Sequence, residues 1–215
     1  MFTGFTQETI DFLWGIRLNN YRDWFEAHKE EYQRTLYQPM KALAAEVFPA
    51  FEKEPNLEQK LSRIYKDARL HPAVPYKESL WLSMRPAHLH WSQQPTLFFE
   101  ITPQGYHYGF ILLQPQAEKM ERWRREVQEN PEEFLSLVKK LQRKTGLTLT
   151  GDSYKRGKPC SVEALKPYFQ LKNFSMEVSR MPDELLFSPS LPGEVVKTLK
   201  ALLPLYRYFL RYTGS

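Results

Sequence analysis

The sequence predicts an α+β fold, in which an antiparallel β-sheet packs against several α-helices in a single domain. Long segments with apolar residues at helical spacing occupy both ends of the chain, and short alternating segments that suit strands lie between them. Helices and strands that are segregated in this way are typical of α+β domains. No repeat, low-complexity tract or linker divides the 215 residues, so we expect one domain over residues 1–215.

The N-terminal part is expected to contain three helices. Thr6 is a suitable cap for the first helix, and Asn20 is placed to cap the second. Pro39 should end or kink the second helix, after which a third runs to about Glu52. The second helix carries an apolar stripe that is typical of a side facing the core, formed by Tyr21, Trp24, Phe25, His28, Tyr32 and Leu36.

Three segments in the middle of the chain alternate between apolar and polar residues and are predicted to form one antiparallel sheet. They are Leu80–Arg85, Leu97–Thr102 and Tyr106–Leu113. Pro103 and Gly105 suit the second and fourth positions of a type I turn, so the last two segments should form a hairpin.

The second half of the chain is expected to be mostly helical. Gly146 should terminate a helical pair, and Pro204 should bend the last helix. The expected elements are helices Ala117–Glu129 and Pro131–Lys144, strands Leu147–Thr150 and Phe174–Val178, and a closing helix Glu194–Tyr212.

The amino-acid composition indicates which cell compartment and which classes of binding partner to expect. Thirty Lys and Arg residues against 25 Asp and Glu give a net charge of +5, which favours anionic partners without requiring nucleic acid. The one cysteine, Cys160, excludes an intramolecular disulfide and a cysteine-based metal cluster, which favours a reducing cytoplasm. No apolar run approaches the ~18 residues of a membrane span, and the N-terminus does not look like a signal peptide. We expect a cytoplasmic protein with no membrane partner and no cofactor.

The densest chemistry lies in the segment from Ser62 to Arg85, in which cations surround a turn stiffened by prolines. If its first part is extended, Arg63, Asp67 and Arg69 share one face. If that part is helical, Arg63 and Asp67 still meet one turn apart. In both geometries Asp67 should lie between two guanidinium groups, which would keep its carboxylate ionised.

Three functional interpretations remain open. The first is a pocket for a small molecule that bears a phosphate or carboxylate, in which Asp67 orients the cations or acts as a base. The second is weak, salt-sensitive nucleic-acid binding by the same cations and exposed aromatic residues. The third is an interaction module in which the ion pairs only brace the fold. The candidate ligand-binding residues are Arg63, Lys66, Arg69, Lys77, Lys155 and Arg156.

Within this set, Arg69 and Lys77 are expected to bind a common anion. One precedes and the other follows the turn between Pro72 and Pro75, so the turn can bring them together. Arg69 can grip a phosphate or carboxylate with two hydrogen bonds, while Lys77 adds a point charge.

Other motifs give weaker candidates. Glu100 is an acid within a predicted strand, either solvated or turned toward the site, and is a second candidate catalytic residue beside Asp67. His88 and His90 would face the same way on a strand, but no third metal ligand stands at a fixed spacing, so no metal site is predicted. Cys160 has no assignable base partner. The run from Gly151 to Lys158 lacks the spacing of a phosphate-binding P-loop.

Several motifs together resemble the domain of unknown function 2461 family of bacterial and fungal proteins. The resemblance implies the fold more than the activity, because the family has no established activity. Leu70 stands in place of the family's usual Phe, and the segment 71–74 is shorter and lacks an Asp-Lys pair. The matching residues are Ser62-Arg63, Lys66-Asp67, Arg69, Pro75-Tyr76-Lys77, Asn19-Asn20, Trp24-Phe25, Lys29, Tyr32, Pro39, Gly151-Asp152 and Tyr154-Lys155-Arg156.

Overall fold

A computed structural model of the chain describes residues 1–67, 69–71, 73–87 and 90–213. Its centre is a five-stranded antiparallel sheet in which every strand pairs with its neighbours in sequence, in the order β1-β2-β3-β4-β5. The predicted α+β class is therefore confirmed. The strands are β1 (Leu57–Leu61), β2 (Leu80–Pro86), β3 (Thr96–Thr102), β4 (Gly105–Leu112) and β5 (Phe174–Arg180).

Helices precede the sheet, fill the connection between β4 and β5, and close the chain. None of those in the described residues is long and apolar enough to cross a membrane. They are α1 (Gln7–Leu18), α2 (Arg22–Ala27), α3 (Lys29–Glu31), the π-helical segment Tyr32–Tyr37, α4 (Gln38–Val47), α5 (Ala117–Glu129), α6 (Pro131–Thr145), α7 (Lys166–Phe169) and α8 (Leu191–Thr213), with 3₁₀ turns at Phe48–Phe51, Trp91–Gln93 and Glu163–Leu165.

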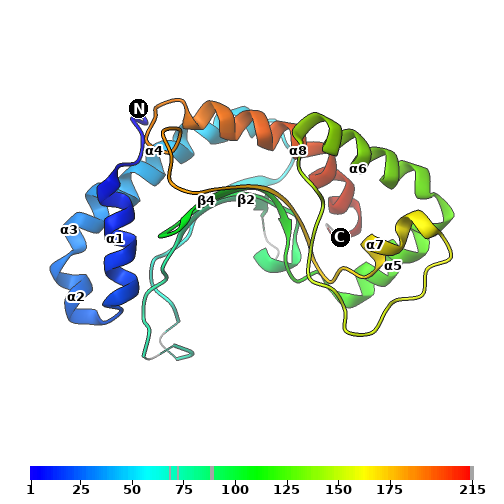
Figure 1. Cartoon of the computed structure of the whole chain (residues 1–215), viewed down its shortest axis with the longest axis horizontal. Coiled ribbons are helices and arrows are strands. Elements are labelled where there is room, and N and C mark those ends of the chain that lie inside the picture. Colours follow the sequence, from blue (N-terminus) through cyan, green and yellow to red (C-terminus); the bar gives the residue numbers. More distant parts are fainter. Residues whose placement is uncertain (68, 72, 88–89, 214–215) are drawn as a thin grey trace.

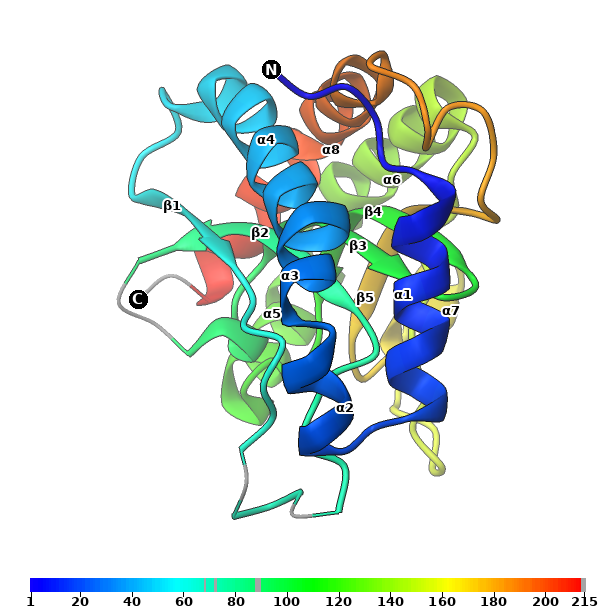
Figure 2. The same cartoon turned by 90° about the vertical axis from the view of Figure 1, so that its left-hand side faces the viewer.

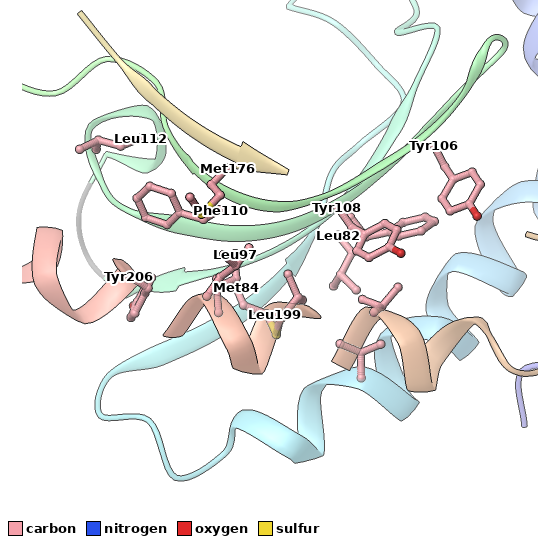
Figure 3. Close-up of a cluster of buried hydrophobic side chains, with 14 of the residues drawn as sticks. Leu82, Met84, Leu97, Tyr106, Tyr108, Phe110, Leu112, Met176, Leu199 and Tyr206 are labelled. Carbon is pink, nitrogen blue, oxygen red and sulfur yellow. The ribbon is translucent and has the colours of Figure 1, made fainter. Parts of the chain in front are cut away.

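One face of the sheet is covered by helices. Figure 1 shows α4 and α8 lying over the arched sheet, and both contact its strands: α8 packs on β3 and β4, and α4 packs on β1 and β2. The core forms at this layer because alternate side chains of each strand point toward the helices. Leu82, Leu97, Phe110 and Met176 are fully buried there and face Leu199 of α8 (Figure 3).

The intervening side chains lie on the other face of the sheet, which is less covered. The register places Trp81 opposite Glu100, Glu100 opposite His107, and Gly109 opposite Glu177. Because these residues alternate with the core residues, all of them project from the face opposite to α8. This open face carries the cavities described below.

Most predicted elements are present, but four details were wrong. The strand β1 was not predicted, and of Leu147–Thr150 only Thr150 forms a bridge, to Ser175. The helix α2 begins at Arg22, with Tyr21 at the N-cap position and no side-chain cap hydrogen bond, while the side chain of Asn20 binds Tyr76 instead. The second predicted helix is also interrupted, since α2 and α3 meet at His28 and a π-helical segment follows.

Candidate functional site

The cation-rich segment of the sequence forms a long two-armed extension of β1 and β2, which is described at residues 62–67, 69–71 and 73–79. Lys66 donates its backbone N–H to Pro75 at 2.8 Å, and Lys77 donates its own to Ile64 at 2.7 Å. Ser62 and Trp81 join the arms at the base through backbone and side-chain hydrogen bonds. The extended alternative is therefore correct up to Lys66, whereas Leu70 and His71 donate their backbone N–H groups to the Asp67 carbonyl in a turn. Figure 2 shows the extension projecting from the sheet beside α2.

The N-terminal helices hold the second arm in place. The Asn20 side chain accepts the backbone N–H of Tyr76 at 2.9 Å and donates to its carbonyl at 3.0 Å. Phe25 of α2 stacks on the Tyr76 ring with centroids 4.2 Å apart. Arg17 of α1 pairs with Glu78 at 2.5 Å. The two motifs noted in the sequence, one around Asn20 and one around Tyr76, thus meet in space and fix the position of Lys77 between them.

Asp67 and Arg69 lie beyond the paired part of the arms and bind each other. The Asp67 carboxylate accepts hydrogen bonds from the Arg69 guanidinium at 2.7 and 3.0 Å, and these bonds hold its pKa below the usual value. The expectation that Asp67 lies between two guanidinium groups is wrong in part, because Arg63 makes no ion pair within the described residues. Arg63 instead lines a separate hollow beside Lys29 and Tyr32.

Lys77 is the candidate cation that enters a cavity on the open face. This cavity has a volume of about 350 Å³, and we call it the basic cavity. Burial lowers the pKa of Lys77, and the like charge of Lys66 lowers it further. No carboxylate pairs with Lys77 within the described residues, so its charge is held there without a counter-ion. The cavity is lined by Lys60, Leu61, Ser62, Lys77, Trp81, Ser83, Arg85, Trp91 and Thr96.

Two further cations of the basic cavity share one acid. Glu58 pairs with Lys60 at 2.8 Å and with Arg85 at 3.3 Å, and Arg85 is 8% exposed. The acid therefore offsets one of these two charges. The indole rings of Trp81 and Trp91 meet edge to face at 6.5 Å and form an aromatic wall. The cavity thus combines excess positive charge with an aromatic surface.

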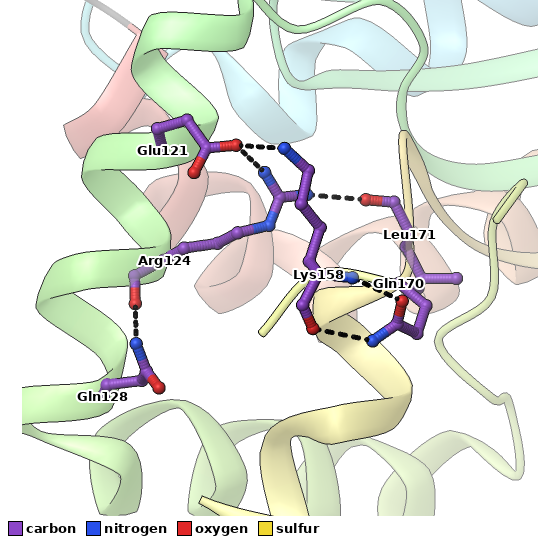
Figure 4. Close-up of polar contacts among 6 residues, drawn as sticks. All are labelled: Glu121, Arg124, Gln128, Lys158, Gln170 and Leu171. Atoms are coloured by element: carbon purple, nitrogen blue, oxygen red, sulfur yellow. Dashed lines mark hydrogen bonds and ion pairs between the residues drawn. The ribbon is translucent and has the colours of Figure 1, made fainter. Parts of the chain in front are cut away.

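Lys155 and Arg156 do not join this group. Their loop lies beside α5 and α7, at the other end of the long axis of the molecule from the extension (Figure 1). Both side chains are exposed. Their neighbour Lys158 is bound to Glu121 of α5 at 2.8 Å, and the same Glu121 oxygen accepts from buried Arg124 at 3.0 Å (Figure 4). The loop is therefore held by a structural ion-pair cluster.

Glu100 lies in a second cavity of about 470 Å³ on the open face, which we call the acidic cavity. Trp81 is a wall of both cavities. Burial raises the pKa of Glu100, as does the charge of Glu177, while hydrogen bonds from the Ser79 and Trp81 side chains and the nearby His107 oppose the rise. Glu100 is thus turned into a cavity, but this cavity is not the one that holds Lys77.

Sequence reasoning missed several residues of these cavities. His107, Glu177 and Lys60 lie outside the recognised motifs, and β1 was not predicted at all. The signal for His107 and Glu177 was their place in alternating strands on the same face as Glu100. Only the pairing of the strands shows that these residues are neighbours.

The remaining candidate residues form no binding or catalytic site within the described part of the chain. His88 lies outside the described residues, and His90 bonds to the Ser92 hydroxyl at 3.0 Å. Cys160 contacts the carbonyl of Val162 at 3.2 Å. Within the described part of the chain, no three His, Cys, Asp or Glu side chains gather in a way that suits a metal ion.

Comparison with protein families gives a match over most of the chain. The model of a family described as "Conserved hypothetical protein (DUF2461)" matches residues 8–208, which is almost the whole chain. No curated protein matches the sequence.

Proposed function

We propose that this chain, which belongs to the DUF2461 family of conserved hypothetical proteins, binds a small carboxylate- or phosphate-bearing molecule in the basic cavity. The observation that carries the proposal is Lys77, a half-buried ammonium group that has another cation beside it and no carboxylate partner within the described residues. Burying an unpaired charge is costly, and a bound anion would offset that cost.

The other lining residues favour a particular shape of ligand. Trp81 and Trp91 offer aromatic surfaces set at 68° to each other, so an aromatic or otherwise planar group that packs on one of these rings next to the anion suits the cavity. Lys60 and Arg85 supply further positive charge at the same wall. The volume of about 350 Å³ is within the range of small-molecule sites, which begins at roughly 300 Å³.

The proposal places Lys77, and not Arg69, at the centre of the site. Arg69 is bound to Asp67, and its side chain is 88% exposed. Anion binding by both residues together remains a prediction, and binding at Lys77 does not require it. Exposed charge pairs contribute little to affinity or stability, whereas a desolvated cation interacts strongly with an anion.

Binding of phenyl phosphate and benzoate, measured by isothermal titration calorimetry, tests the proposal. Lys77→Met keeps the apolar stem of the side chain and removes the charge. A charge-assisted hydrogen bond contributes about 1.5–3 kcal/mol, so the affinity should fall by roughly ten- to a hundredfold. Lys155→Met is the matched control, because it removes a cation from the far loop and should leave the affinity unchanged.

Two results would contradict the proposal. One is that neither anion binds to the wild-type chain. The other is that Lys77→Met and Lys155→Met weaken binding equally, which would indicate a general charge effect. Uniform losses of this kind, combined with salt-sensitive binding of single-stranded DNA, would favour the nucleic-acid alternative.

A further inference from the structure

The hollow that contains Arg63 is lined by the N-terminal helices on one side and by the first arm of the extension on the other. Its volume is about 370 Å³, and it has Leu61 and Ser62 in common with the basic cavity. Figure 2 shows α2 and α3 beside this arm. We call it the tyrosine hollow, and its functional groups come from Lys29, Tyr32, Tyr37, Arg63 and Tyr65.

The π-helical segment Tyr32–Tyr37 brings two of these tyrosines to the same hollow. Gln38 donates its backbone N–H to the carbonyl of Gln33, five residues earlier. Hydrogen bonds of this kind place residues five apart on one side of the helix, and the rings of Tyr32 and Tyr37 lie with their centroids 5.8 Å apart. In an α-helix the same two residues would point about 140° apart. Single π-helical turns are frequent at functional sites, and here such a turn builds one wall of the hollow.

Tyr32 is a buried residue whose hydroxyl has no hydrogen-bond partner within the described residues. Its side chain is held in place by fully buried Phe25, which also packs against Tyr65, with ring centroids at 5.5 and 5.6 Å. Tyr32 is 5% exposed, and burial raises its pKa, so the hydroxyl keeps its proton and can donate it. A buried donor without a partner is costly, and a bound acceptor would offset that cost.

The charge in the hollow is positive. Arg63 makes no ion pair within the described residues, and no Asp or Glu of those residues lines the hollow. Lys29 pairs with Glu26 at 3.3 Å, but both side chains are about half exposed, so this pair is weak. An arginine can grip two oxygens of a phosphate at once, and the remaining oxygens can accept hydrogen bonds from hydroxyl groups.

We propose that the tyrosine hollow binds the phosphate group of a small phosphate monoester, with Arg63 gripping two of its oxygens and Tyr32 and Tyr37 donating hydroxyl protons to it. Lys29 adds positive charge on the helical side. The volume leaves room for the organic part of the ligand, since it falls within the range of small-molecule sites, which begins at roughly 300 Å³. A carboxylate suits the hollow less well, because it has fewer oxygens to share among these donors. This second site does not depend on Lys77.

Binding of glycerol 2-phosphate to the Lys77→Met variant, measured by isothermal titration calorimetry, tests the proposal. This background removes the central cation of the basic cavity, so the result stands apart from the outcome there. Arg63→Met should weaken binding by roughly ten- to a hundredfold. Arg125→Met, which removes an exposed arginine from α5, is the matched control and should leave the affinity unchanged. Glycerate, a carboxylate of similar size, should bind more weakly than the phosphate.

Removal of single hydroxyl groups separates ligand binding from folding. Tyr32→Phe should weaken binding by about three- to tenfold. The melting temperature of the free protein should stay the same or rise, because the lost hydroxyl has no partner in the described residues. Tyr106→Phe gives the opposite pattern, since the Tyr106 hydroxyl donates to Asp183 at 2.9 Å: it should lower the melting temperature and leave binding unchanged.

Four results would overturn the proposal. The first is that the Lys77→Met variant does not bind glycerol 2-phosphate, and the second is that Arg63→Met and Arg125→Met weaken binding equally. The third is that Tyr32→Phe lowers the melting temperature as Tyr106→Phe does, without loss of affinity. The fourth is that glycerate binds as tightly as the phosphate, which would contradict the preference for a phosphate group.

Discussion

Asn20 and Tyr76 are joined by a reciprocal pair of hydrogen bonds, in which one side-chain amide satisfies both the N–H and the C=O of a backbone unit 56 residues away. Tyr76 is only 2% exposed, so water cannot easily replace the amide. The pair connects the turn after α1 to the arm that carries Lys77.

Asn20→Ala should therefore destabilise the protein. It leaves a buried donor and a buried acceptor unpaired, and each such group costs about 1–3 kcal/mol. Chemical denaturation measures the change. Asn19→Ala is the natural comparison, because among the described residues the Asn19 amide donates to the carbonyl of Gly15 in its own helix and not to a distant segment. A loss no larger for Asn20→Ala than for Asn19→Ala would show that the pair does not stabilise the arm.

Arg69→Ala should change the titration of Asp67 more than the stability of the fold. The guanidinium lowers the Asp67 pKa, so its removal should return this pKa toward the ordinary value of 3.8. The stabilising effect of the pair is present above that value and is lost as pH falls through the lowered pKa. Carbon-13 NMR of the carboxyl follows the pKa. Because the pair is exposed, the melting temperature at pH 7 should move by less than about 2 °C; a large drop would instead favour a bracing role.

Glu100→Gln should remove part of the pH dependence of stability. The folded-state pKa of Glu100 lies above its ordinary value of 4.5, so the folded state binds more protons than the unfolded state between these values. Wild-type stability should fall as pH rises through this window, and the variant should lack that component. Urea unfolding at pH 4 and pH 7 measures it. The variant should gain relative to the wild type at pH 7, and an equal difference at both pH values would contradict the raised pKa.

Gly109→Ala should damage the centre of the sheet. A Cβ at this position would lie 2.4 Å from the Met176 carbonyl oxygen and 2.6 Å from the Glu177 Cα, both of which are backbone atoms that cannot turn aside. Overpacking of this kind costs about 1–3 kcal/mol. Gly193→Ala, in the first turn of α8, meets no atom within 4 Å and should be neutral or slightly stabilising. Thermal unfolding of the two variants makes the comparison, and equal melting temperatures would argue against the contact.

The sequence predicted the sheet where its physical signals are local. The alternation of apolar and polar residues predicted β2, β3 and β4, and the turn at Pro103 predicted the hairpin of β3 and β4. It failed at β1, whose residues Leu57–Leu61 are mostly polar and are recognisable only by their pairing with β2. Asn20 has the residue type of a helix cap, but its amide is used by Tyr76, and a long-range contact of this kind leaves no local pattern.

The candidate site was predicted from a cluster of cations in the sequence. The structure revised it, because it shows what surrounds each of these cations. The cluster of cations drew attention to the extension, but Arg69 and Lys77 differ in what surrounds them. Arg69 has an acid two residues away in sequence, whereas the environment of Lys77 comes from β1, β2 and the turn that holds Trp91. Glu100 could be named from the sequence, but its relation to Glu177 depends on β4 lying between their strands.

The backbone hydrogen bonds between the two arms, at Lys66 and at Lys77, place Lys77 on the sheet side of the last pairing. The number of residues beyond that pairing can therefore change without moving Lys77, because the hydrogen bonds that position Lys77 lie between the pairing and the sheet. The departures of segment 70–74 from the family pattern fall in this region. Lengthening this loop by a few residues should accordingly be tolerated, with Lys77 held at the same place.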